Sequence, residues 1–347
     1  MDNVTHTLFA LTLARTRLWR GRGTTAALAL ASNAPDLDIV AALGGGSNYL
    51  TWHRGPTHGL LGVIGLGLAT ALLVRGGDRL IRQARGAPGG GGAPLGPLLG
   101  ASVAGVLAHI LMDLPTSYGT RVLSPFDWRW FALDLLPIID IYLLIALAAG
   151  LVFGRGLPER GRRVATVVLI LMAANYGLRM IVHQQALAVA ARTFGPDLPA
   201  PCDPGRAFRS LLDSWPRPDP RPAGDGSCLV ETAAIPTFLS PFEWRVIARL
   251  PDAYQVYDVD VLDPGRRTAA WTPNQWPPVV IDAARTRAAT ALLGFSRFPH
   301  ARVTTDPAGV PLVRFTDMRF AELVDRQPPA ARSEMFTVVV RMPADRD

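Results

Sequence analysis

The chain has 347 residues, of which 49% are hydrophobic, and its mean hydropathy is positive at +0.21. This composition excludes an ordinary soluble domain of the same size, and the length allows about two domains. The formal net charge of +7 comes from arginine, because no lysine occurs. The arginines form short clusters between apolar runs, as in membrane proteins, so we expect a membrane lipid environment and no nucleic-acid partner.

Four apolar runs have the length of about 20 residues that a bilayer-spanning helix requires. They cover residues 57–75, 97–116, 134–154 and 164–186. A fifth run, 24–43, is interrupted by polar residues and predicts a weaker span, while residues 4–18 predict a short amphipathic or half-inserted helix. The glycine-rich segment 85–97 predicts a flexible linker.

The distribution of arginine predicts an orientation in the cytoplasmic (inner) membrane. Arginines cluster at 15–22, 75–85 and 155–163, so we expect these three connections to face the cytoplasm. The connections at 44–56 and 117–133 then lie on the opposite side. These two loops carry aromatic residues typical of a membrane interface: Tyr49, Trp52, Tyr118, Trp128 and Trp130.

The character of the sequence changes after about residue 187. Period-two alternation predicts strands in "EWRVIARL" (243–250), "YQVYDVDVL" (254–262), "VPLVRFTDMRF" (310–320) and "MFTVVVRM" (335–342). The predicted fold class is therefore mainly α. A polytopic membrane helical bundle in residues 1–187 is followed by a small β-rich (α+β) extracytoplasmic domain in residues 188–347.

Both cysteines lie in this second part, at Cys202 and Cys228. Their spacing fits neither a zinc knuckle nor a CxxC motif. If the region is extracytoplasmic, a single disulfide is the expected state, and a pair of unrelated free thiols is the alternative.

The residues that suggest chemistry all precede residue 114. In "LAHILMDLP", His109 and Asp113 are four apart, so on a helix their side chains lie on one face, one turn apart. An imidazole and a carboxylate placed in this way can reach one metal ion, as in helix-built metal sites. This pair suits zinc, iron or manganese, and the lack of nearby thiols argues against a structural zinc site.

Three further motifs carry polar groups: "VTHTLFA", "NAPDLDIV" and "WHRGPTH". They supply His6, Asp36, Asp38, His53 and His58. With the predicted topology, all of these groups converge with the 109–113 pair at one membrane face. A charged aspartate at membrane depth costs about 2.5–3.5 kcal/mol, and a divalent cation would offset that cost.

Each motif also has a simpler interpretation. His6 could be an ordinary helix residue, and "PDLD" could be an N-cap with a solvated carboxylate. "HRGPTH" could be an interfacial loop that binds lipid phosphate. His109 and Asp113 could be an intrahelical hydrogen-bonded pair. Together these alternatives require four unrelated reasons for polar groups to gather at one level of the membrane, so we favour a metal site.

The ordered set "THT", "PDLD", "HRGPTHG" and "AHILMDLPTSYG" resembles the YdjM-like family of membrane-bound, metal-dependent hydrolases. The resemblance covers roughly residues 1–190 and implies an integral membrane protein with metal-dependent hydrolase activity. The motif order is also similar, more distantly, to zinc phospholipase C and P1 nuclease. This chain has no N-terminal tryptophan and no second H-x3-E pair, so one or two metal ions are expected rather than three.

The predicted function is therefore hydrolysis of a phosphoester or lipid-like substrate at the outer membrane–water interface. His6, Asp36, His53, His58, His109 and Asp113 are the expected ligands of a divalent metal, with zinc preferred to manganese or iron. Asp38 is expected to act as general base or to support a ligand. Arg54 is expected to hold a substrate phosphate, with Gly55 and Pro56 shaping its turn.

Two further acids, Asp134 and Asp140, are candidates for supporting the ligands, with a capping role preferred for Asp134. The rival function is a non-enzymatic metal-binding scaffold or transporter whose outer β-rich domain binds a partner. Intramembrane histidines and acids also form ion pathways. However, transporters usually repeat their broken helices in two halves, and no second "PDLD" or "HRGPTH" occurs.

Overall fold

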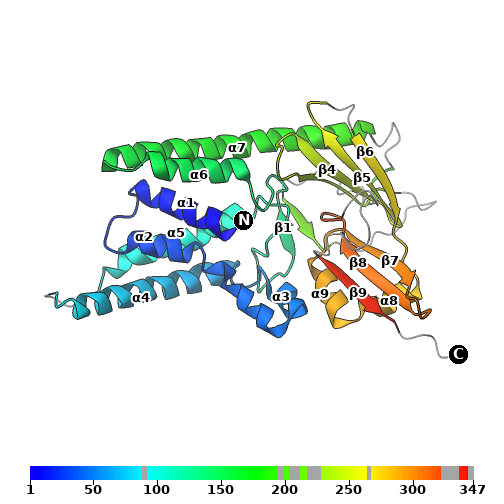
Figure 1. Ribbon diagram of the computed structural model, residues 1–347, viewed down its shortest axis with the longest axis horizontal. Coiled ribbons are helices and arrows are strands. Elements are labelled where there is room, and N and C mark those ends of the chain that lie inside the picture. Colours follow the sequence, from blue (N-terminus) through cyan, green and yellow to red (C-terminus); the bar gives the residue numbers. More distant parts are fainter. Residues whose placement is uncertain are drawn as a thin grey trace. The chain divides into compact units, whose positions relative to one another are not determined.

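The computed structural model describes residues 1–87, 92–193, 199–202, 212–216, 228–263, 267–321 and 336–342 (Figure 1). The central residues of the predicted linker, 88–91, lie outside these ranges. The chain divides into two compact units. The first comprises Met1–Val40 and Trp52–Met180, and the second comprises Ala41–Thr51 and Ile181–Asp347. The division falls within one long helix, at residue 180, and the second unit also takes in the short segment 41–51.

Helices dominate the first half of the chain. In chain order they are α1 (Asn3–Arg15), α2 (Thr24–Ala31), the 3-10 helix η1 (Pro35–Gly44), α3 (Gly46–Trp52), α4 (Leu60–Ala84), α5 (Leu95–Asp113), α6 (Ile141–Phe153) and α7 (Pro158–Thr193). A short strand, β1 (Trp130–Ala132), lies between α5 and α6. Within the first unit α1, α2, α4 and α5 lie side by side, and α6 lies beside α7 (Figure 1).

Three helices among the described residues are long and apolar enough to cross a membrane. They are α4, α5 and the Pro158–Val189 part of α7, and they confirm the predicted runs at 57–75, 97–116 and 164–186. The weaker run at 24–43 forms the pair α2 and η1, which is bent by 43°. The bend is explained by Pro35, because proline disfavours helical backbone in the residue before it.

The prediction of a full span over 134–154 is wrong. Helix α6 begins only at Ile141 and has 13 residues, a length of about 20 Å against a hydrocarbon core of about 30 Å. The preceding segment contains Pro137, and Asp134 has a positive φ of 55°. Asp140 then acts as the N-cap, because its side chain accepts a hydrogen bond from the backbone N–H of Leu143 at 2.9 Å.

Small residues let the helices of the first unit approach closely. A Cβ atom on Gly67 of α4 would lie 2.8 Å from Val103 of α5. A Cβ atom on Gly105 of α5 would lie 2.9 Å from both the Ala31 Cβ and the Leu28 carbonyl oxygen of α2. Such contacts are typical of helices that pack without a hydrophobic driving force between them. They hold α2 and α4 against α5.

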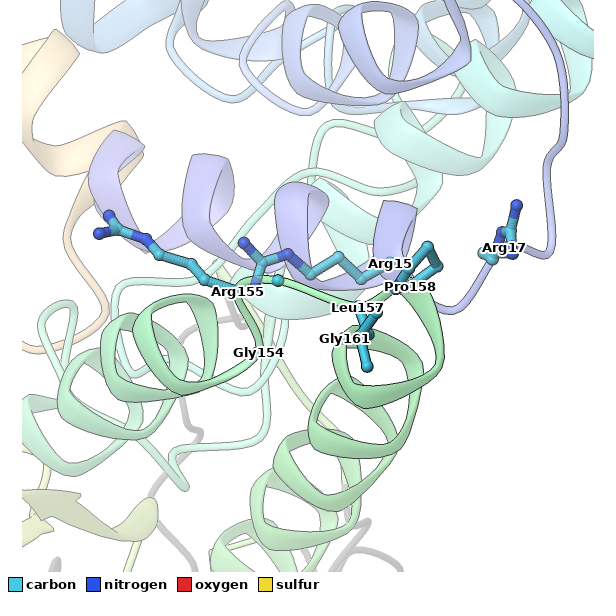
Figure 2. Close-up of a pocket in the computed structure, with 8 residues that line it drawn as sticks. Arg15, Arg17, Gly154, Arg155, Leu157, Pro158 and Gly161 are labelled. Carbon is cyan, nitrogen blue, oxygen red and sulfur yellow. The ribbon is translucent and has the colours of Figure 1, made fainter.

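The turn between α6 and α7 lies beside the C-terminal end of α1 (Figure 2). Arg15, the last residue of α1, donates from Nη1 to the backbone oxygens of Gly150 at 3.3 Å and Leu151 at 2.8 Å. A cation in this position stabilises the C-terminal end of α6, where backbone carbonyls lack partners.

The second unit contains the remaining strands and two short helices. They are β2 (Asp213–Trp215), β3 (Glu231–Pro236), β4 (Glu243–Arg249), β5 (Ala253–Asp260), β6 (Arg267–Pro273), α8 (Pro278–Ala284), α9 (Arg287–Phe295), β7 (Pro299–Thr305), β8 (Pro311–Asp317) and β9 (Thr337–Arg341). Strands β3 to β6 form an antiparallel sheet in sequence order, and β7 to β9 form a second one. The four predicted strands correspond to β4, β5, β8 and β9 and are confirmed.

The two sheets of the second unit share a buried core. Tyr254 and Val256 of β5 pack with Phe298 and Met318, which flank β7 and β8. On another side, the C-terminal part of α7 contributes Val182, Ala186 and Leu187 to a cluster with residues of β3, β4 and β5. The alternation read from the sequence therefore reflects strands with one face in a common core.

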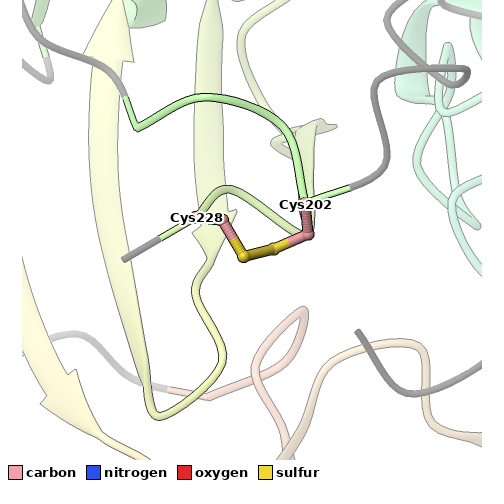
Figure 3. The surroundings of a disulfide bond; sticks show 2 residues. All are labelled: Cys202 and Cys228. Atoms are coloured by element: carbon pink, nitrogen blue, oxygen red, sulfur yellow. A yellow bond between two sulfur atoms is a disulfide. The ribbon is translucent and has the colours of Figure 1, made fainter. Parts of the chain in front are cut away.

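Cys202 and Cys228 form a disulfide, as predicted (Figure 3). The bond closes a loop with a sequence separation of 26. Chain-entropy reasoning then gives a stabilisation of about 3 kcal/mol. We expect Cys202→Ser/Cys228→Ser to leave the fold intact but to destabilise the second unit by about this amount. Hydrogen exchange in strands β3 to β5 of the full chain measures it, and unchanged exchange would contradict the prediction.

Candidate metal centre

Helix α5 ends with the pair that the sequence singled out. His109 Nε2 lies 3.2 Å from Asp113 Oδ2, and both side chains are fully buried. His109 Nδ1 lies 2.8 Å from the carbonyl oxygen of Ser32, which follows α2. The close approach of α2 at Gly105 makes this contact possible. Because a carbonyl can only accept, His109 carries its proton on Nδ1, and its Nε2 has a lone pair.

His58 meets His109 from the loop that precedes α4. Their Nε2 atoms are 3.1 Å apart. His58 Nδ1 lies 3.1 Å from the hydroxyl of Thr57 and 3.7 Å from Asp38 Oδ2. Burial, together with the positive charge of Arg54, lowers the pKa of His58 well below its usual range. When the neutral His58 ring carries its proton on Nδ1, its Nε2 presents a second lone pair, and the two Nε2 atoms then face each other as acceptors.

Carboxylate oxygens surround this pair of imidazoles. Asp36 Oδ1 lies 3.6 Å from Nε2 of both His58 and His109. Asp113 Oδ2 lies 3.4 Å from His58 Nε2 and has no hydrogen-bond partner among the described residues. The Asp36 side chain is 18% exposed, whereas that of Asp113 is fully buried. Negative charge therefore gathers where the two imidazole lone pairs meet.

His6 joins the site from the first turns of α1. Its ring stacks on that of His109 with centroids 3.8 Å apart, and its Nε2 lies 3.5 Å from Asp113 Oδ1. Both ring nitrogens of His6 are buried without a hydrogen-bond partner among the described residues. Such orphaned buried groups are unusual in a folded protein and call for a missing partner.

Two groups of three residues could therefore hold a metal ion. The first is His6, His109 and Asp113, and the second is Asp36, His58 and His109. Within each group the ligand atoms lie within 4.8 Å of one another, and His109 belongs to both. Imidazole and carboxylate ligands of this kind suit zinc, and also manganese or iron. Five of the six predicted metal ligands thus lie together.

His53 is not part of either group. Its Nδ1 lies 3.2 Å from Asp38, which also accepts a 2.6 Å hydrogen bond from the backbone N–H of Arg54. Burial lowers the pKa of His53, although the hydrogen bond to Asp38 acts in the opposite direction. The structure thus pairs the predicted sixth ligand with the predicted general base.

Arg54 lies inside the protein rather than facing open space. Its side chain donates to Asp113 Oδ1 at 3.1 Å and to the Gly119 carbonyl at 2.9 Å, and it stacks over the Tyr118 ring at 4.7 Å. Arg54 also has a positive φ of 51°. The left-handed residue of the turn is therefore Arg54 rather than Gly55. Gly55 is needed for its small size, because a Cβ atom there would lie 2.7 Å from the Trp52 carbonyl oxygen.

Several contacts of the site could not be expected from the motifs. The Ser32 carbonyl and the α-amino group of Met1, which forms an ion pair with Asp113, carry no sequence signal. Tyr118 and Trp130 were predicted as interfacial aromatics, yet both are buried, 5% and 0% exposed. Arg121 stacks on Trp130 at 4.3 Å, and burial lowers its pKa to about 10.

The remaining acids and histidines make contacts outside the two groups. Asp140, besides capping α6, forms a buried ion pair with Arg179 at 2.9 Å. Asp134 is buried in the segment before α6. His183 packs against Trp244, and His300 Nε2 lies 3.1 Å from the Pro273 carbonyl.

Comparison with known proteins identifies a family for this part of the chain. The sequence profile of the YdjM inner membrane protein family matches residues 1–186, which include every residue of the two groups. The chain belongs to the YdjM family. As a YdjM-family protein with several apolar helices, it is a multi-pass membrane protein.

Relatives give little further guidance for this YdjM-family chain. It is 26% identical to the uncharacterized protein YfhP of Bacillus subtilis (strain 168) over 152 residues, and this aligned region is 44% of the chain. The matched region spans 42% of the length of that relative. No solved structure matches the chain.

Proposed function

We propose that this protein is a membrane-bound, metal-dependent hydrolase. His6, Asp36, His58, His109 and Asp113 would hold one or two divalent cations, with zinc favoured over manganese or iron. The observation that carries the proposal is the 3.1 Å separation of His58 Nε2 and His109 Nε2, which have carboxylate oxygens of Asp36 and Asp113 around them. A cation relieves the repulsion between these lone pairs and also partners the orphaned nitrogens of His6.

The remaining residues supply proton transfer. A divalent ion, when bound, provides Lewis acidity and makes water nucleophilic near neutral pH. Asp38 holds His53 by its Nδ1, which leaves Nε2 as the acceptor of the neutral ring. His53 is therefore suited to take a proton as general base, and Asp38 orients it and stabilises its charged form.

Arg54 holds a ligand in this proposal. Its guanidinium contacts Asp113 Oδ1, so it fixes the carboxylate and leaves Oδ2 directed at His58 and His109. The same guanidinium was expected to bind a substrate phosphate directly. Its burial and its contact with Gly119 favour the positioning role instead.

The substrate class is a phosphoester or lipid-like molecule at the membrane–water interface. The site lies where α5 ends at Asp113 and where α4 begins, directly after His58 and Gly59. These are the ends of two candidate spans, not their middles. The arginine distribution would place this end, and the C-terminal unit, outside the cytoplasm.

The test is turnover by the full chain in lipid nanodiscs loaded with zinc or manganese. We expect release of phosphate or of a phosphorylated headgroup from at least one member of a panel of phospholipids and polyprenyl phosphates. The metal-free chain should be inactive. If the chain binds metal but hydrolyses no member of the panel, a metal-binding scaffold or transporter becomes the better description.

His53→Ala tests whether the proposed general base is distinct from the metal ligands. We expect it to retain the wild-type metal content and to lower the turnover number by about 100-fold or more, because general bases contribute about 10²–10⁴. Asp38→Asn should lower turnover less and shift its pH profile, since it acts through His53. Metal analysis beside turnover measures both effects. Loss of metal from His53→Ala would instead make His53 a ligand.

A further inference from the structure

A second polar site lies at the other end of α1. A cavity of about 400 Å³ lies between the C-terminal end of α1 and the turn from α6 to α7 (Figure 2). Its lining includes Arg15, Arg17, Arg155, Leu157 and Pro158. His6 and Arg15 are nine positions apart on α1, which corresponds to about 14 Å along a helix. The cavity is therefore separate from the candidate metal centre.

Three arginines give this cavity a positive charge. Arg15 is held by the carbonyls at the end of α6. Arg17 and Arg155 are exposed and have no carboxylate partner among the residues that the structure describes. Glu159 is the acid in the first turn of α7, but it does not line the cavity. The guanidinium groups of Arg17 and Arg155 extend toward opposite sides of the cavity (Figure 2), so an anion can meet either of them from its own side.

The start of α7 also favours the binding of an anion. Pro158 is the first residue of this 36-residue helix and lines the cavity. The first N–H groups of a helix lack intrahelical partners, and the helix dipole is positive at this end. Phosphate groups are commonly bound at such positions, and arginine is suited to their geometry.

Apolar side chains are exposed at the turn beside the cavity. Leu157 is 75% exposed, and Phe153, at the end of α6, is 63% exposed. Gly154 lies close to Arg15 in the lining, because a Cβ atom on Gly154 would lie 2.8 Å from Arg15 Nη1. A charged lining beside exposed apolar residues matches a molecule with a phosphate head and an apolar tail.

We propose that this cavity binds a phosphate group carried by an anionic membrane lipid or by a small phosphorylated solute. The arginine distribution predicts that this end of the bundle faces the cytoplasm, where anionic lipids attract basic segments. The site is independent of the proposed hydrolase activity, since it shares no residue with the candidate metal centre.

The experiment compares two double variants of the full chain in nanodiscs. Arg17→Gln/Arg155→Gln removes the two available guanidinium groups. Arg162→Gln/Arg163→Gln, on the exposed start of α7 and outside the lining, removes the same charge and is the control. One arm uses equal amounts of phosphatidylglycerol and phosphatidylcholine and measures retained lipid by native mass spectrometry. The other arm uses phosphatidylcholine alone and titrates inorganic phosphate.

We expect the wild-type chain to retain more phosphatidylglycerol than phosphatidylcholine. In the cavity variant the ratio of the two retained lipids should fall about ten-fold, and in the control variant it should be unchanged. Retention of phosphatidylglycerol that depends on the cavity arginines identifies a lipid as the source. Phosphate binding that the cavity variant alone loses identifies a solute. If both double variants lose binding equally, or if neither loses it, the proposal is overturned.

Discussion

Replacing His109 by alanine is expected to remove all bound divalent metal from the purified chain. His109 is the residue that both candidate groups share, and the contact of its Nδ1 with the Ser32 carbonyl fixes the direction of its lone pair. The variant should therefore also lose hydrolytic activity. Its rate should fall to that of the metal-free wild-type chain. Metal content by mass spectrometry, measured per mole of chain, tests this directly.

Two other substitutions show how many ions the site holds. His6 and Asp36 each belong to one group only, so His6→Ala and Asp36→Ala should each remove one ion if the site holds two. His183→Ala is the matched control, because it removes a histidine of α7 that packs against Trp244. Full metal content in His109→Ala, in protein that elutes as the wild type does, would rule out the proposed centre.

The sequence predicted that the candidate ligands gather in one place because its two strongest signals are local. The i, i+4 spacing of His109 and Asp113 needs only an α-helix to place both side chains on one face. The convergence of "PDLD" and "HRGPTH" needed only the order of the apolar runs. Both inferences survive errors of several residues in the helix boundaries.

Other features of the site depend on tertiary contacts and could not be predicted in this way. The Ser32 carbonyl reaches His109 only because Gly105 lets α2 approach α5. Arg54 turns inward because Asp113, Gly119 and Tyr118 surround its guanidinium. A side chain at a predicted membrane interface can point either way, and the sequence does not decide between them.

In the second unit, too, some strands could be predicted from their local sequence, whereas another depends on pairing with a neighbouring strand. Strands β4 and β5 alternate clearly and were predicted, and their paired register buries Val246 and Val256. Strand β3 reads "ETAAIP" and is buried at nearly every position, so it has no alternation to detect. Its place in the sheet is set by pairing with β4.

Gly59→Ala is expected to disrupt the candidate metal centre, although alanine tolerates the local backbone. Gly59 is the N-cap of α4 with φ −95° and ψ −175°, an extended conformation open to any residue. A Cβ atom at this position would lie 2.0 Å from the carbonyl oxygen of Ser124. The loop that carries His58 must therefore move away from the 117–133 segment, which separates His58 from His109.

The expected loss is overpacking of about 1–3 kcal/mol in stability, together with most of the bound metal. Gly65→Ala is the matched control on the same helix, because a Cβ atom there would meet nothing within 4 Å. This second change should keep the metal and leave stability equal or slightly higher, since alanine favours helix over glycine. Thermal unfolding and metal content of both variants decide the matter. Equal behaviour of the two would mean that the contact between His58 and His109 does not depend on how closely this loop approaches Ser124.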